Sequence, residues 1–133
     1  MTQVMKGMRM LEVAEHTFVP TASALLSDWG AEVIKIEPVE RGDAIRGLTS
    51  SGTSDVHAMH QHSNRRKRSL ALDLSAPEGV DILYKLVATS DVFLTNKLPR
   101  VRKKLKIDVA DIRVHNPSII YVRQRAGRAR AGF

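Results

Sequence analysis

The chain has 133 residues, of which 43% are hydrophobic and 26% are charged, with no cysteine and a formal net charge of +7. This composition predicts one globular domain with a hydrophobic core, and it excludes disulfides, thiolate nucleophiles and cysteine-ligated metals. The sequence contains neither a run of about 18 apolar residues nor a signal-peptide pattern, so it predicts a cytoplasmic protein without a membrane-spanning helix.

The positive charge is concentrated towards the end of the chain. Residues 97–133 hold 11 Lys and Arg against 2 Asp and Glu, whereas residues 1–96 hold 10 basic and 12 acidic residues. A basic segment of this kind is typical of an anionic partner, a solvated face or a tail outside the fold.

Hydrophobic periodicity predicts alternating strands and helices along the chain. Short apolar or alternating runs indicate strands, and apolar residues at helical spacing indicate helices. A stretch rich in Gly, Ser, Thr and Asp indicates a long loop. The predicted elements are a strand at 8–14, a helix at 20–29, a strand at 31–37, a loop at 38–56, a strand at 69–74, a helix at 75–87, a strand at 91–96, one or two short helices within 101–115, and a strand at 118–123.

Several residues mark where the predicted helices begin and end. Pro20 suits a first helical position, and Gly30 is a good terminator. Ser75 and Glu78 have the spacing of a capping box, with Ser75 as the N-cap. Asp108 is the expected N-cap of a later short helix.

Alternation of strands and helices predicts an α/β fold with a parallel sheet and helices on both faces. Ligands in such folds bind outside the carboxyl ends of the strands. The candidate binding segments are therefore residues 14–18, 37–46, 73–75, 96–99 and the residues from 123 onward.

The last eleven residues, RQRAGRARAGF, break this pattern because they hold four Arg, no acid and little periodicity. We expect residues 1–122 to form the domain and residues 123–133 to form a disordered basic tail. A shifted reading frame would also explain the change in composition.

Histidines are the first candidates for chemistry. His57, His60 and His62 could ligate a metal, but no further ligand completes a site, and solvated loop histidines are the favoured interpretation. His16 follows the first strand and could be catalytic, although a packed or capping role is favoured. Glu15 beside it has no partner visible in the sequence.

Three charged segments can each be interpreted either as a binding site or as solvated surface. The Gly42-Asp43-x-x-Arg46 segment is adequately explained by a turn with a solvent-exposed ion pair. The basic run at 65–68 and the cationic residues at 100–104 could hold phosphates, and the alternative in each case is a solvated surface.

Six segments together resemble the class III CoA-transferases, a family that includes formyl-CoA transferase, carnitine CoA-transferases and α-methylacyl-CoA racemase. They cover about 120 residues, and "GAEVIKIEP" followed by "KRSLALDL…PEG" is the most specific combination. The segments are GMRMLEVAEHTFVP, LLSDWGAEVIKIEP, GDAIRG, NRRKRSLALDLSAPEG, LVATSDVFLTN and HNPSIIYV.

The resemblance implies a Rossmann-like sheet that binds coenzyme A across the strand ends, without a metal. The family transfers CoA between an acyl-CoA and a carboxylic acid, and its subunits form interlocked homodimers. The positions that match CoA contacts of the family are Thr17, Phe18, Pro38, Leu72, Asp73, Leu74, Ser75, Asn96, Lys97, Leu98 and Lys104.

The chain also departs from the family pattern. Lys97 stands where the family usually has Phe, Arg100 where it has Gly, and Arg66 where Gly is frequent. Family members are much longer, and their catalytic Asp lies beyond the matched segments. We therefore expect a truncated CoA-binding half with no catalytic residue, without turnover of its own and with exposed apolar surface that favours association.

A different function remains as an alternative, namely a basic, non-catalytic module that binds nucleic acid or another polyanion through residues 65–68 and 97–133. The scarcity of aromatic residues, 5% of the chain, argues against it. The favoured interpretation makes the basic run a cationic loop that leads into a central strand and attracts the phosphates of CoA.

Overall fold

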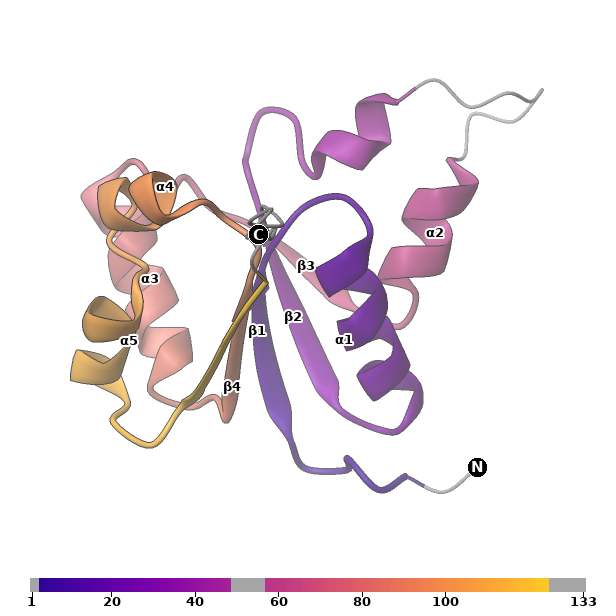
Figure 1. Ribbon diagram of the computed structural model, residues 1–133, viewed down its shortest axis with the longest axis horizontal. Helices are drawn as coiled ribbons and strands as arrows, with labels where there is room; N and C mark the ends of the chain where they lie inside the picture. Colours follow the sequence, from indigo (N-terminus) through magenta and orange to yellow (C-terminus); the bar gives the residue numbers. More distant parts are fainter. Residues whose placement is uncertain (1–2, 49–56, 125–133) are drawn as a thin grey trace, which may run out of the picture.

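A computed structural model describes residues 3–48 and 57–124 as one parallel sheet of five strands with helices on both faces (Figure 1). The strand order is β3-β2-β1-β4-β5, and every neighbouring pair is parallel. The predicted α/β class is thus confirmed. The strands are β1 (Arg9–Val13), β2 (Glu32–Glu37), β3 (Arg68–Ala71), β4 (Val92–Thr95) and β5 (Ile120–Arg123).

The helices divide between the two faces of the sheet. In Figure 1, α1 and α2 cover one face, and α3, α4 and α5 cover the other. None of the helices in the described part of the chain is long and apolar enough to cross a bilayer. The helices are α1 (Phe18–Asp28), the 3-10 turn η1 (Ala44–Gly47), α2 (Ala58–Asn64), α3 (Pro77–Val87), α4 (Pro99–Lys104) and α5 (Val109–His115).

Side-chain alternation along β1 builds a core on each face of the sheet. Leu11 and Val13 pack with Phe93 in the cluster beneath α3 and α5, whereas Met10 and Ala14 belong to the cluster on the opposite face. Leu11 and Phe93 are fully buried, and each such side chain contributes roughly 1.5–3 kcal/mol through the area that it removes from water.

Two predictions about the strand at 69–74 and the segment before it are wrong. The strand, β3, lies at an edge of the sheet rather than in its centre. Helix α2 was not predicted, because its short sequence, AMHQHSN, carries few apolar residues at helical spacing. Strand order depends on long-range pairing, which local periodicity does not encode.

The helix boundaries agree with some of the predicted end signals. Gly30 has φ of +102° and follows α1, as expected of a terminator, but α1 begins at Phe18, two residues before Pro20. Asp108 caps α5 and forms a capping box with Asp111. Strand β5 ends at Arg123, and the rest of the predicted tail, from residue 125, lies outside the described residues, as do residues 49–56 of the predicted loop.

Candidate functional site

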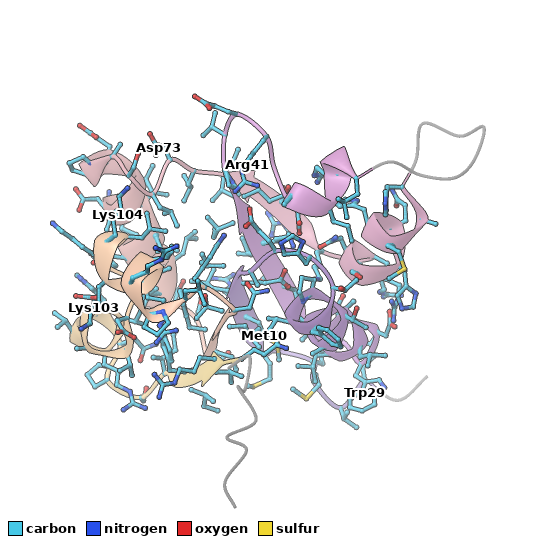
Figure 2. The ribbon with its side chains drawn as sticks, turned by 45° about the horizontal axis from the view of Figure 1, so that its top comes forward. Met10, Trp29, Arg41, Asp73, Lys103 and Lys104 are labelled. Atoms are coloured by element: carbon cyan, nitrogen blue, oxygen red, sulfur yellow. The ribbon has the colours of Figure 1, made fainter. Side chains whose placement is uncertain are left out.

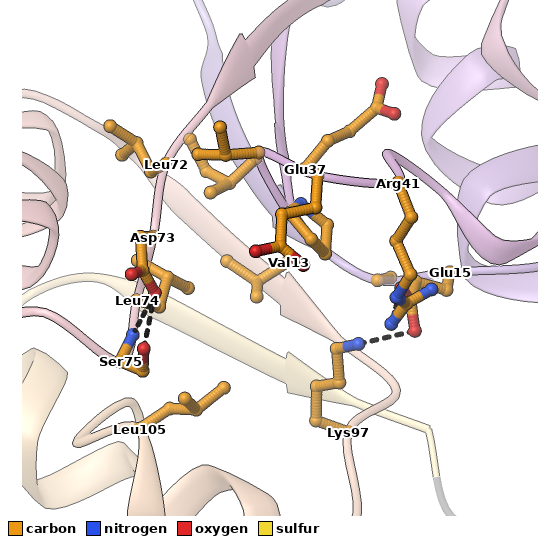
Figure 3. Close-up of a pocket in the computed structure, with 15 residues that line it drawn as sticks. Val13, Glu15, Glu37, Arg41, Leu72, Asp73, Leu74, Ser75, Lys97 and Leu105 are labelled. Carbon is orange, nitrogen blue, oxygen red and sulfur yellow. Dashed lines mark hydrogen bonds and ion pairs between the residues drawn. The ribbon is translucent and has the colours of Figure 1, made fainter.

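A cavity of about 470 Å³ opens at the carboxyl ends of β1, β2 and β3 (Figure 3). Aliphatic side chains make much of its wall, and charged groups lie around them, a composition typical of small-molecule sites. The lining residues are Val13, Ala14, Glu15, Ile36, Glu37, Pro38, Val39, Glu40, Arg41, Leu72, Asp73, Leu74, Ser75, Lys97 and Leu105.

The structure brings six of the eleven predicted contact residues into this wall. They follow β2, β3 and β4, and they are Pro38, Leu72, Asp73, Leu74, Ser75 and Lys97. Asn96 instead supports the wall, because its amide group donates to the carbonyl of Glu15 at 2.7 Å and accepts from the N–H of Glu15 at 3.2 Å.

The remaining predicted contacts lie elsewhere. Thr17 is the N-cap residue of α1, and Phe18 after it is 78% exposed. Leu98 precedes α4 and is 55% exposed. None of these three side chains lines the cavity, and their contact with a ligand stays a prediction.

Lys104 lines a second, smaller cavity of about 160 Å³ between α3 and α4. The two cavities share Leu74, Ser75 and Leu105, so they are neighbours. Lys106 and Asp81 of α3 also line the second cavity. Figure 2 shows Arg41 and Asp73 at one end of the sheet, with Lys103 and Lys104 on the side of α4.

A tight turn shapes the wall between the two cavities. The N–H and the hydroxyl of Ser75 donate to the carboxylate of Asp73 at 2.9 and 2.6 Å. The hydrogen bond from the Ser75 hydroxyl lowers the pKa of Asp73. The predicted capping box of Ser75 and Glu78 is wrong, because Asp73 takes the hydroxyl of Ser75 and Ala76 is the N-cap residue of α3.

Three charged residues from three loops meet at the edge of the large cavity. Glu15 forms ion pairs with Lys97 at 2.6 Å and with Arg41 at 2.8 Å (Figure 3). The sequence shows no partner for Glu15, and the structure supplies two. The departure at Lys97 was the signal in the sequence, since a cation in place of Phe can pair with an acid or with an anionic ligand.

A buried network of charges lies beneath this site, on the face covered by α1. Lys35 pairs with Glu12 at 2.8 Å and with Asp43 at 2.6 Å, and Lys67 pairs with Glu12 at 2.7 Å. All four side chains are at most 2% exposed. Burial lowers the pKa of Lys67 to about 8, although the nearby carboxylate of Glu12 opposes this shift.

The Gly42-Asp43-x-x-Arg46 segment belongs to this network, so its interpretation as a solvent-exposed turn is wrong. Asp43 is buried and accepts from the N–H groups of His16 and Ile45, at 3.0 Å each. Arg46 pairs with Glu37, which is 5% exposed. The motif thereby ties the loop after β2 to the loop after β1.

Histidine roles differ from the favoured interpretations. His16 is exposed, with φ of +68°, and it is held by its backbone N–H rather than by packing or capping. His57 caps α2, and His60 is 8% exposed, so they are not solvated loop residues. Within residues 3–48 and 57–124, no three side chains with metal-ligating groups gather.

The basic run at 65–68 lies at the amino end of β3, away from the cavity at its carboxyl end. Arg65 pairs with Asp28 and Arg68 with Glu32, while Lys67 is in the buried network. The run therefore does not line the cavity, and three of its four cations are already paired with acids. Long-range attraction of CoA phosphates by this run, and binding of nucleic acid to it, stay predictions. The cationic segment at 100–104 is also partly structural, because buried Arg102 pairs with Asp108 at 3.0 Å.

Comparison with protein families gives a match to the model described as CoA-transferase family III over residues 5–126. The chain is 37% identical over 123 residues to a succinate–glutarate CoA-transferase of Agrobacterium fabrum, covering 88% of this chain and 31% of the relative. It is 34% identical over 122 residues to an (R)-2-hydroxy-4-methylpentanoate CoA-transferase of Clostridioides difficile, covering 89% of this chain and 30% of the relative.

Solved structures give the same result for the fold. The structure of Rv3272 from Mycobacterium tuberculosis matches with a TM-score of 0.84 and 33% identity, covering 92% of this chain and 34% of that one. A CAIB/BAIF family protein from Brucella suis matches with a TM-score of 0.83 and 28% identity, covering 92% and 33%. The chain therefore spans about a third of the length of the proteins that it matches.

Proposed function

The chain belongs to CoA-transferase family III, and from this premise we propose that its large cavity binds the CoA part of an acyl-CoA. The observation that carries the proposal is the position of the cavity. It lies at the carboxyl ends of parallel strands, where this architecture places its ligands, and residues that match CoA contacts of the family line it.

The shape and chemistry of the two neighbouring cavities suit the parts of CoA. The aliphatic wall that includes Ile36, Leu72 and Leu105 offers a surface against which an adenine ring can pack. Lys104 and Lys106 line the adjoining cavity and can act as point charges for phosphate oxygens. The shared residues Leu74 and Ser75 would then lie under the middle of the nucleotide.

The reaction that this binding serves in the family is transfer of CoA between an acyl-CoA and a carboxylic acid, and we propose that the 133-residue chain contributes CoA binding without turnover of its own. Both relatives described above are named CoA-transferases, and the two names point to different acyl groups. The proposal therefore concerns the CoA part of the substrate.

Isothermal titration of the 133-residue chain with CoA tests the proposal. We expect saturable binding, and we expect Ser75→Glu to weaken it by about tenfold, equivalent to about 1.4 kcal/mol, because a new carboxylate would face the phosphates. Ser75 is exposed in the free chain, so the substitution should not disturb the core.

Ser118→Glu is the matched control. Ser118 is also exposed, but it precedes β5 at the opposite end of the sheet. Absence of any heat with the wild-type chain would overturn the proposal. Equal loss of affinity in both variants would also contradict it, because the effect would then come from net charge alone.

A further inference from the structure

We infer that Arg41 and Lys97 bind an anionic group of the ligand, and that Glu15, which pairs with both, lowers the affinity of this anion site. The inference rests on the proposed function, since it concerns the same cavity. It adds the site for a second anionic part of the ligand, apart from the lysines of the smaller cavity.

The geometry places both cations around one carboxylate at the edge of the cavity. The carboxylate of Glu15 is 2.6 Å from the ammonium nitrogen of Lys97 and 2.8 Å from the guanidinium of Arg41. The exposed fractions are 14% for Glu15, 19% for Lys97 and 55% for Arg41. Glu15 and Lys97 are thus mostly buried and Arg41 is half-exposed, and all three line the cavity (Figure 3).

The N–H donors of Arg41 and Lys97 are numerous enough for the cluster to bind another anion. Arg and Lys side chains carry more N–H donors than one carboxylate can accept. Glu15 neutralises one of two positive charges, so the cluster keeps a net charge of +1. An incoming carboxylate or phosphate can bridge the two cations, but it is repelled by the carboxylate that is already there.

The rest of the described cavity wall carries no other cation to which an anion could bind. Arg41 and Lys97 are the two cations among the described residues that line the cavity, whereas Glu37, Glu40 and Asp73 are acidic. Glu37 already pairs with Arg46. An anionic group that enters this cavity therefore approaches Arg41 and Lys97.

The backbone around Glu15 is held by hydrogen bonds from the loop after β4. The side chain of Asn96 holds both the N–H and the carbonyl of Glu15. The carbonyl of Lys97 accepts from buried Arg102 at 2.7 Å. Glu15 is consequently a positioning residue, which pairs with both cations and reduces their combined charge.

Two parts of an acyl-CoA could supply the anion, namely a phosphate of CoA or a carboxylate on the acyl group or the acid. Titrations with CoA, with pantetheine, which lacks the phosphates, and with glutarate, which has only carboxylates, separate them. The variants are Glu15→Gln, Arg41→Gln and Lys97→Met. Lys103→Gln is the matched control, because Lys103 is exposed on α4 and lines neither cavity.

We expect E15Q to bind the anionic probe about three- to tenfold more tightly, and R41Q and K97M to bind it more weakly by a similar factor, as one unit charge at short range implies. K103Q should bind like the wild type. If the anion is a phosphate, these changes in affinity should appear with CoA but not with pantetheine. If the anion is a carboxylate, they should appear with glutarate.

Affinities within twofold of the wild type for E15Q, R41Q and K97M with every probe would overturn the inference while leaving CoA binding intact. Absence of binding of every probe to both the wild type and E15Q would overturn the proposed function as well. Thermal melting checks that each variant folds. Should E15Q not fold, R41Q decides the question, because the side chain of Arg41 is half-exposed and outside the core.

Discussion

At the scale of single residues, Asp43 shows how one buried carboxylate organises the loops of the site. Its carboxylate forms an ion pair with Lys35 and accepts hydrogen bonds from the backbone N–H groups of His16 and Ile45. Burial raises the pKa of Asp43, but the hydrogen bonds from Lys35 and the two N–H groups outweigh burial and lower it overall. The left-handed backbone of His16 is thereby fixed at the carboxyl end of β1.

Asp43→Asn should lower the free energy of unfolding by about 3–5 kcal/mol, because it leaves the buried charge of Lys35 with one carboxylate instead of two. Urea unfolding monitored by circular dichroism measures the change. Asp81→Asn, at an exposed position of α3, is the control and should have little effect. A loss below about 1 kcal/mol for D43N would show that the network contributes little.

Lys67 is a buried cation of the same network. It lies within a run of four basic residues, yet its side chain is 2% exposed and its ammonium group contacts Glu12 and the carbonyl of Pro20. A basic run is usually a solvated face, and only the three-dimensional position of Glu12 distinguishes this lysine from its neighbours.

At the scale of elements, the start of α3 sets the shape of the wall between the two cavities. Gly79 packs directly against the turn that contains Asp73, and a Cβ atom there would lie 2.0 Å from the carbonyl oxygen of Asp73. The close approach explains a glycine inside a helix, where it normally costs about 1 kcal/mol relative to alanine.

Gly79→Ala should therefore destabilise the protein by about 3 kcal/mol, since the clash with backbone outweighs the gain in helix propensity. It should also weaken CoA binding, because Asp73 and Ser75 must move. Gly47→Ala is the matched control, with no atom within 4 Å of its Cβ, and should change the unfolding energy by less than about 0.5 kcal/mol. Wild-type stability of G79A in thermal melts would contradict the packing argument.

At the scale of the whole molecule, buried acids make stability depend on acidic pH. Burial raises the pKa of Glu37, but hydrogen bonds from Arg46, from the N–H of Asp43 and from Ser69 outweigh it and lower the pKa from 4.5 to about 2. The folded state therefore favours the charged form. This contribution to stability is fully present above about pH 4.5 and is lost as the pH falls to about 2.

The shift at Glu37 corresponds to about 3 kcal/mol of stability, which should disappear between pH 4.5 and 2. Urea unfolding at pH 7, 4.5, 3 and 2 measures the loss. Glu37→Gln should be less stable at pH 7 and should show a shallower decline, whereas Glu40→Gln, at an exposed position, should follow the wild type. Identical declines for the wild type and E37Q would refute the assignment.

The sequence by itself determined the order of strands and helices along the chain apart from α2, the parallel α/β class and the segments that follow the strands. These properties depend on periodicity and turn chemistry, which are local along the chain. The same locality explains why Pro38 and residues 73–75, which follow predicted strands, were expected at the site and do line the cavity, whereas Leu72 was expected from the family resemblance. It also explains the family resemblance, because short segments in a fixed order carry it.

Only the tertiary structure decided the strand order, the burial of Lys67 and Asp43, and the partners of Glu15. The edge position of β3 follows from pairing across the sheet. Glu15 and Lys97 are 82 residues apart in the chain, and Lys67 and Glu12 are 55 apart. Electrostatic energy depends on distance in space and on burial, and neither quantity is fixed for such residues until the chain has folded.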